Sequence, residues 1–134
     1  MAETEQSGAL YQGVLVHSVL VIDDDELHLA LMQNILQQEG YKVFTTADGP
    51  QGIAIYKEHR PDIVLLDLGL PRMNGLEILR RLRTIDEKAR IIVLTGHGSE
   101  ESAELALRYG ASDYVRKPFD CSSLIKRIKV VIYA

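Results

Sequence analysis

Carboxylate, hydroxyl and ammonium side chains lie directly after short apolar runs of the sequence. Asp23 and Asp24 follow the first run, Asp67 follows another, Thr95 a third and Lys117 a fourth. Neighbouring carboxylates repel each other, and the pKa of at least one rises unless a cation neutralises them. Carboxylates and waters are the ligands that Mg²⁺ prefers, and an aspartate can itself attack phosphorus to form an aspartyl phosphate. These residue types therefore favour a site where Mg²⁺ (or Mn²⁺) assists transfer of a phosphoryl group onto a carboxylate.

The elements that would position these side chains alternate along the chain. Short β-branched runs predict five strands, at residues 19–22, 42–45, 63–66, 91–94 and 112–115. Segments with three- and four-residue apolar spacing predict five helices, at residues 26–39, 50–59, 75–84, 99–109 and 120–133. This alternation is typical of a doubly wound α/β domain with a parallel sheet. Ligands of such domains bind beyond the carboxyl ends of the strands, where the chemical side chains lie.

Apolar spacing within the helices indicates which side chains face the sheet. In the first helix, Leu27, Leu31 and Ile35 recur at four-residue steps, and we expect them to pack in the core. The same reasoning places four side chains of the last helix inward, namely Leu124, Ile125, Ile128 and Val131.

Length and composition exclude several classes of protein. The 134 residues suit one domain, and 46% hydrophobic with 25% charged residues excludes a disordered chain. A net charge of −4 argues against binding to nucleic acid or an anionic membrane. The apolar run at residues 14–22 is interrupted by His17 and Ser18 and is shorter than the roughly twenty residues of a membrane span. A single cysteine, Cys121, cannot form an internal disulfide, so we expect a cytoplasmic protein.

Four motifs stand in order at the ends of the predicted strands: Val21-Ile22-Asp23-Asp24, Leu66-Asp67-Leu68-Gly69-Leu70-Pro71-Arg72-Met73-Asn74-Gly75, Val93-Leu94-Thr95-Gly96, and Gly110-Ala111-Ser112-Asp113-Tyr114 with Lys117-Pro118-Phe119. On these motifs, residues 19–132 resemble the receiver domain of two-component response regulators, the family of the chemotaxis response regulator. The resemblance implies a flavodoxin-like (βα)5 three-layer sandwich whose five-stranded parallel sheet has the order 2-1-3-4-5.

The resemblance also assigns roles to residues at the matching positions. Asp67 would be the phospho-acceptor, and the metal would be held by Asp24 directly, by Asp23 mainly through water, and by Asp67 and the backbone carbonyl of Gly69. Lys117, ahead of a cis peptide bond to Pro118, would pair with the phosphoryl oxygens.

Two further residues would transmit the phosphorylation signal. Thr95 would be the hydroxyl that moves to the phosphoryl group, and Tyr114 the aromatic that turns inward with it. The partner surface implied by Tyr114 is the face formed by the fourth helix, fifth strand and fifth helix.

Simpler interpretations exist for several of these residues. Asp25 is best read as the cap of the first helix. Asp67 could be a turn residue, and Tyr114 could be an ordinary half-buried strand aromatic. The four histidines, His17, His28, His59 and His97, lie in different segments without metal-ligand spacing, so we do not expect a zinc site.

Two enzyme-like or cofactor-binding alternatives use related folds. A phosphatase of the haloacid dehalogenase type needs a second aspartate two residues after the nucleophile, where this chain has Gly69. A flavin-binding electron carrier needs a phosphate loop after the first strand, where this chain has three aspartates that would repel phosphate. We therefore expect a phospho-acceptor that assists its own phosphorylation and dephosphorylation, and not a turnover enzyme.

The expected partners follow from this function. They are a histidine kinase or histidine phosphotransfer protein, and a downstream protein target or output domain, with phosphorylation-dependent homodimerisation as a further possibility. Residues 1–18 are expected to be a flexible extension and residues 19–134 the receiver domain, either stand-alone or part of a longer regulator.

Overall fold

The strands and helices alternate as the sequence predicts. The computed structural model describes residues 8–69, 74–96 and 100–134. Its central sheet contains β3 (Ser18–Ile22), β4 (Lys42–Thr46), β5 (Ile63–Asp67), β6 (Ile91–Thr95) and β7 (Asp113–Arg116). Adjacent strands are parallel and lie in the order β4-β3-β5-β6-β7, which confirms the order 2-1-3-4-5 for these five strands.

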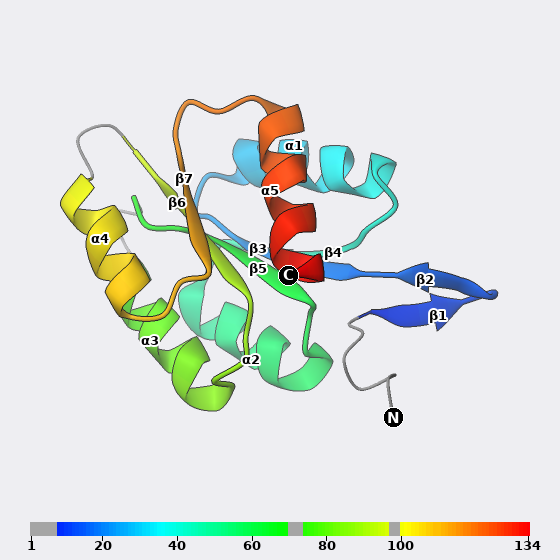
Figure 1. Ribbon diagram of the computed structural model, residues 1–134, viewed down its shortest axis with the longest axis horizontal. Coiled ribbons are helices and arrows are strands. Elements are labelled where there is room, and N and C mark those ends of the chain that lie inside the picture. Colours follow the sequence, from blue (N-terminus) through cyan, green and yellow to red (C-terminus); the bar gives the residue numbers. More distant parts are fainter. Residues whose placement is uncertain (1–7, 70–73, 97–99) are drawn as a thin grey trace.

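Five helices cover the two faces of this sheet. They are α1 (Glu26–Gln38), α2 (Gly49–His59), α3 (Gly75–Ile85), α4 (Glu100–Arg108) and α5 (Cys121–Tyr133). Helices α1 and α5 lie on one face and α2, α3 and α4 on the other (Figure 1). Side chains alternate across each strand, so Val19 and Val21 of β3 join the first core and Leu20 and Ile22 the second. Both faces of the inner strands β3, β5 and β6 are buried, which explains why these three strands are almost wholly apolar.

The buried face of α1 differs from the prediction. Leu27 is 80% exposed and Leu31 is 53% exposed, whereas Leu29, Met32 and Leu36 are buried and Ile35 is partly buried. Leu29, Met32 and Leu36 have a three- and four-residue spacing of their own, and their packing against the sheet leaves Leu27 and Leu31 on the solvent side. In α5, by contrast, the four predicted inward residues are all buried.

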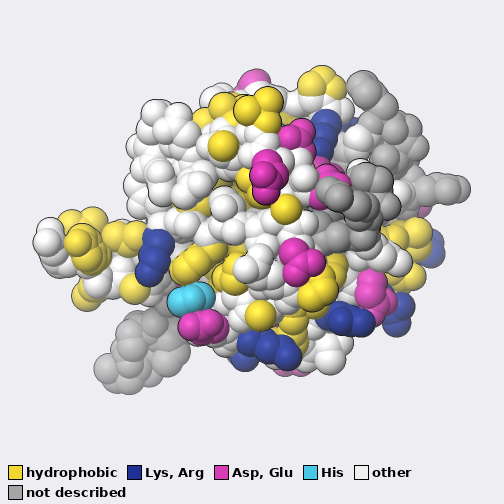
Figure 2. Space-filling model, turned by 180° about the vertical axis from the view of Figure 1, so that it is seen from behind, with side chains coloured by type: hydrophobic (Ala, Val, Ile, Leu, Met, Phe, Trp, Pro, Cys, Tyr) yellow, Lys and Arg dark blue, Asp and Glu magenta, His cyan; other side chains and the backbone are white. Residues whose placement is uncertain are grey.

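A β-hairpin precedes the central sheet and was not predicted. Strands β1 (Ala9–Tyr11) and β2 (Val14–Val16) pair antiparallel, and the central sheet then begins at Ser18. The hairpin stands out from the body of the molecule (Figures 1 and 2), and Leu10, Tyr11 and Val14 are each more than 60% exposed. Its three-residue strands are too short to show a clear alternating pattern in the sequence. Among the described residues, no helix is long and apolar enough to cross a membrane.

Candidate phosphorylation and metal site

Two buried carboxylates lie at the carboxyl ends of neighbouring strands. Asp23 follows β3 directly and Asp67 is the last residue of β5, and these strands pair in the sheet. Asp23 is 1% exposed and Asp67 is 3% exposed. Two charged carboxylates at such depth are costly unless cations or hydrogen-bond donors offset their charge.

Lys117 supplies one positive charge to this pair. It follows β7, and its Nζ contacts Oδ2 of Asp67. The backbone N–H of Lys117 donates to the carbonyl of Thr95 at 2.7 Å, which fixes the segment beside β6. The peptide bond between Lys117 and Pro118 is cis, as the resemblance implied. One lysine offsets only one of the two buried negative charges.

The Thr95 hydroxyl is buried without a partner. Thr95 ends β6 beside β5 and is 1% exposed, and its Oγ1 makes no hydrogen bond within the described residues. A buried hydroxyl that lacks a partner costs about 1–3 kcal/mol. Such a donor is available to an oxygen atom brought to this edge of the sheet.

The three consecutive aspartates after β3 have different environments. Asp25 is the cap of α1, and its Oδ1 accepts from the backbone N–H groups of Leu27 at 3.0 Å and His28 at 3.2 Å. Asp24 is half-buried and lines the same pocket as Asp23 and Asp67. The interpretation of Asp25 as a helix cap is therefore correct.

The pocket at this edge has a polar side and an apolar side. Its volume is about 460 Å³, and its polar lining includes four aspartates (Asp23, Asp24, Asp25 and Asp67) with Gly69 and Lys117. Leu31, Ile35 and Phe119 contribute apolar lining. Carboxylate oxygens within one small pocket are a donor set that suits a hard divalent cation, so the described residues fit the expected magnesium site.

His28 is the one functional candidate that the sequence reasoning set aside. Its Nδ1 contacts Oδ2 of Asp23, and the ligand atoms of Asp23, His28 and Asp67 all lie within 4.8 Å of one another. The other described histidines lie elsewhere, with His17 against Tyr133 and His59 stacked on Phe44. His97 lies outside the described residues. The sequence signal that could have identified His28 is its position five residues after Asp23, because the turn from a strand into a helix lies between the two.

Comparison with known proteins decides the family. The family model described as "Response regulator receiver domain" matches residues 19–129. The chain belongs to the response regulator receiver family. "Sporulation initiation phosphotransferase F" of Bacillus subtilis is 36% identical over 83% of this chain and 90% of that protein. "Cell cycle response regulator CtrA" of Brucella ovis is 40% identical over 85% of this chain but only 49% of its own length.

A solved structure agrees with the sequence comparisons. The response regulator receiver domain protein from Clostridium thermocellum superposes with a TM-score of 0.82 at 34% identity, over 87% of this chain and 94% of that one. This receiver therefore acts in phosphorelay signalling, and the comparisons do not support the phosphatase alternative. Gly69 donates its backbone N–H to Oδ1 of Asp67 at 2.8 Å, at the position where that phosphatase would need an acid side chain.

Tyr114 of the receiver lies on β7 beside the second core. It is half-buried, packs against the core cluster beneath α2, α3 and α4, and is the register partner of Val93. Its neighbour Asp113 forms an ion pair with Arg127 of α5, which connects β7 to that helix.

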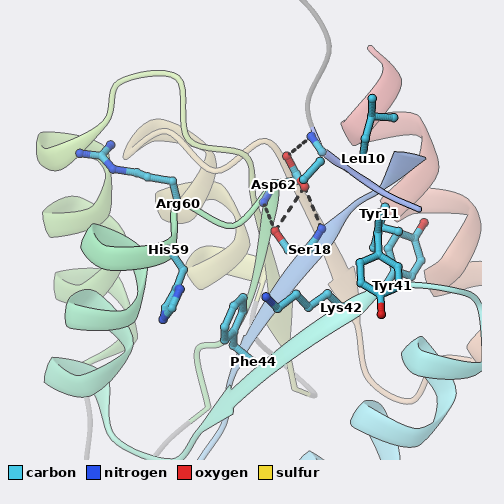
Figure 3. Close-up of a pocket in the computed structure, with 12 residues that line it drawn as sticks. Leu10, Tyr11, Ser18, Tyr41, Lys42, Phe44, His59, Arg60 and Asp62 are labelled. Atoms are coloured by element: carbon cyan, nitrogen blue, oxygen red, sulfur yellow. Dashed lines mark hydrogen bonds between the residues drawn. The ribbon is translucent and has the colours of Figure 1, made fainter. Parts of the chain in front are cut away.

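A second cavity lies at the opposite edge of the receiver's sheet. It has a volume of about 640 Å³ and lies between the hairpin, the start of β4 and the end of α2. Asp62 connects these parts, because it accepts hydrogen bonds from the backbone N–H groups of Gly8 at 2.6 Å and Ser18 at 2.7 Å (Figure 3). Ser18, Lys42 and Asp62 mark the amino ends of the strands, so this cavity is separate from the aspartate site.

Proposed function

We propose that this receiver accepts a phosphoryl group on Asp67 from a phosphohistidine of a sensor kinase or histidine phosphotransfer protein. The observation that carries the proposal is the buried pair of Asp23 and Asp67, with Lys117 in contact with Asp67. A carboxylate held beside a second carboxylate and a lysine is placed to act as a nucleophile toward an anionic group.

In the transfer step, an oxygen of the Asp67 carboxylate attacks phosphorus. The phosphorus–nitrogen bond breaks, and its electron pair returns to the donor's histidine ring, whose other nitrogen is protonated, so that the ring leaves as neutral imidazole. Lys117 then pairs with an oxygen of the phosphoryl group. The Gly69 N–H holds Oδ1 of Asp67 and so orients the carboxylate. Hydrolysis by water breaks the new phosphorus–oxygen bond and restores the carboxylate.

Asp23, Asp24, Asp67 and the Gly69 carbonyl would hold the divalent cation, Mg²⁺ or Mn²⁺. When bound, the cation neutralises charge on the phosphoryl oxygens. Burial of Asp23 and Asp67 supports this assignment, because Lys117 offsets only one of their two charges.

Thr95 and Tyr114 are proposed to report phosphorylation to the surface. The unpartnered Oγ1 of Thr95 donates to a phosphoryl oxygen, which favours the conformer where the hydroxyl has moved. Tyr114 then turns inward. The face formed by α4, β7 and α5 is thereby altered, and it binds a downstream protein, an output domain or a second copy of the chain. No direct contact with nucleic acid or membrane is part of this proposal.

The phosphohistidine-bearing partner is proposed to dock on α1. Leu27 and Leu31 are exposed on this helix, and Leu31 also lines the pocket that contains Asp67. An exposed apolar rim beside a reactive carboxylate suits a protein donor. Leu27→Lys should therefore slow phosphorylation by a phosphohistidine protein and leave phosphorylation by a small-molecule donor unchanged.

Phosphoramidate tests the donor chemistry, because it is a small molecule with a phosphorus–nitrogen bond. After incubation with Mg²⁺, borohydride reduces an aspartyl phosphate to homoserine, and peptide mass spectrometry locates it. We expect homoserine at position 67 only. Homoserine at position 23, 24 or 25 in its place would overturn the assignment of Asp67.

A further inference from the structure

His28 gives the metal site of this receiver a nitrogen donor. Its Nδ1 contacts Oδ2 of Asp23, and its ligand atom lies within 4.8 Å of those of both Asp23 and Asp67. The His28 side chain is 22% exposed, and that of Asp23 is 2% exposed. Nδ1 of His28 therefore contacts the Asp23 carboxylate on the buried side of the pocket.

The local fold fixes this position. Asp25 caps α1 and accepts from the backbone N–H of His28, which places His28 in the first turn of the helix. The Asp25 N–H in turn donates to Oδ1 of Asp23 at 2.9 Å, which leaves Oδ2 toward the histidine. The ring of Phe119 lies 6.4 Å from the imidazole ring and packs beside it.

The spacing of these atoms is close to that of a coordination shell. Nitrogen and oxygen ligands lie about 2.0–2.2 Å from first-row divalent ions, so two ligands on opposite sides of an ion are roughly 4.2 Å apart. The ligand atom of Asp67 is already within 4.8 Å of the other two, whereas Nδ1 of His28 and Oδ2 of Asp23 are in direct contact and move apart by side-chain rotation when an ion binds both.

The donor type decides which ion the site favours. Mg²⁺ binds almost wholly to oxygen, whereas imidazole nitrogen suits the later first-row ions such as Ni²⁺ and Zn²⁺, and the affinity of a nitrogen-containing site rises from Mn²⁺ through Co²⁺ to Ni²⁺. We propose that His28 coordinates the metal through Nδ1, together with Asp23 and Asp67, and that this receiver binds first-row transition ions in preference to Mg²⁺. This inference rests on the proposed metal site and adds a ligand to it.

Electron spin echo spectroscopy of the Mn²⁺-loaded protein tests the inference directly. We expect ¹⁴N modulation from a coordinated imidazole in the wild type and in His59→Gln, and none in His28→Gln. His59 is a suitable control because it is exposed and lies at the end of α2, away from this site. Calorimetry should show that His28→Gln weakens Co²⁺ binding at least about tenfold while the Mg²⁺ affinity changes by less than about twofold.

Three results would overturn the inference, and they can be told apart. Wild-type protein without ¹⁴N modulation, but with Mg²⁺ binding and phosphorylation, would remove His28 from the metal shell and leave the proposed function standing. An equal loss of Co²⁺ and Mg²⁺ affinity in His28→Gln would show that His28 only positions Asp23. Failure of the wild type to bind either ion would contradict the proposed function itself.

Discussion

Asp23 and Asp67 are held by matching hydrogen bonds. In each, Oδ1 accepts from the backbone N–H two residues further along the chain, at 2.9 Å from Asp25 and 2.8 Å from Gly69. Their Oδ2 atoms take different partners, Nδ1 of His28 for Asp23 and Nζ of Lys117 for Asp67. The two buried carboxylates are thus oriented in the same way by the backbone. They differ in the side chain that contacts Oδ2, which is an imidazole for Asp23 and an ammonium group for Asp67. This difference agrees with the proposed roles, in which Asp23 binds the metal and Asp67 is also the phospho-acceptor.

Asp24 should contribute to metal affinity, whereas Asp25 should not. Asp24→Asn removes a ligand charge, and we expect Mg²⁺ affinity to fall by about tenfold or more in a calorimetric titration. Asp25→Asn is the matched control, since asparagine caps a helix as well as aspartate does. Equal losses of affinity in the two variants would show a general effect of acidic charge and not a specific ligand.

Replacing the Thr95 hydroxyl should separate stability from signalling. In Thr95→Val the unpartnered hydroxyl is lost, so the free energy of unfolding in urea should stay the same or rise by about 1 kcal/mol. The change in the amide NMR spectrum of β7 on adding beryllofluoride and Mg²⁺ should be much smaller than in the wild type.

Thr46→Val is the matched control for that experiment. Thr46 is also buried, but its Oγ1 accepts from the backbone N–H of Asp48 and donates to Oε1 of Gln51. This control should lose about 1–2 kcal/mol of stability and keep the beryllofluoride response. A full response in Thr95→Val would contradict the role of Thr95.

Asp62 should hold the hairpin against the body of the receiver. Asp62→Ala removes the acceptors for the N–H groups of Gly8 and Ser18, and we expect a loss of about 1–2 kcal/mol and faster hydrogen exchange at both amides. Ser18→Ala removes the hydroxyl that bonds to Asp62 but keeps the carboxylate acceptor, so it should raise the exchange rate of Gly8 less than Asp62→Ala does. Unaltered exchange of Gly8 in Asp62→Ala would show that the hairpin is held by other contacts.

The stability contributed by the hydrogen bond between Tyr56 of α2 and Asp86 at the end of α3 should depend on pH. Burial alone would raise the pKa of Asp86, but hydrogen bonds from the Lys88 N–H and the Tyr56 hydroxyl, with the charges of Arg60 and Arg83, lower it below its usual value of 3.8. A lowered pKa in the folded state means that the contribution of Asp86 is present above pH 3.8 and is lost as the pH falls further. Asp86→Ala should therefore cost about 1 kcal/mol at pH 7 and progressively less below about pH 4. A cost that does not change with pH would contradict this prediction.

The sequence predicts the central fold well because its signals are strong and mutually consistent. The apolar runs of β3, β5 and β6 are buried on both faces, and the residue types at the ends of these strands identify one edge of the sheet as the site. Asp25, Asp48, Asn74 and Asp120 each cap a helix, and such caps are local features that sequence alone can indicate.

Three features escaped prediction. The leucines at positions 27 and 31 face solvent because a different set of apolar side chains, Leu29, Met32 and Leu36, packs α1 against the sheet. The hairpin is held by a hydrogen bond between Asp62 and Gly8, which are 54 residues apart. His28 reaches Asp23 only because the chain turns from β3 into α1 between them, and no spacing rule for metal sites covers that turn.

Intact-mass analysis after incubation with acetyl phosphate tests the central claim most directly. Wild-type protein with Mg²⁺ should gain a single phosphoryl adduct, and the adduct should be absent without the metal and absent in Asp67→Asn. Asp113→Asn is the matched control, since Asp113 also lies on a sheet strand but pairs with Arg127 away from the site, and it should be phosphorylated normally. A folded wild-type protein that gains no adduct and forms no beryllofluoride complex, or an Asp67→Asn variant that is phosphorylated like the wild type, would contradict the assignment of Asp67 as the phospho-acceptor.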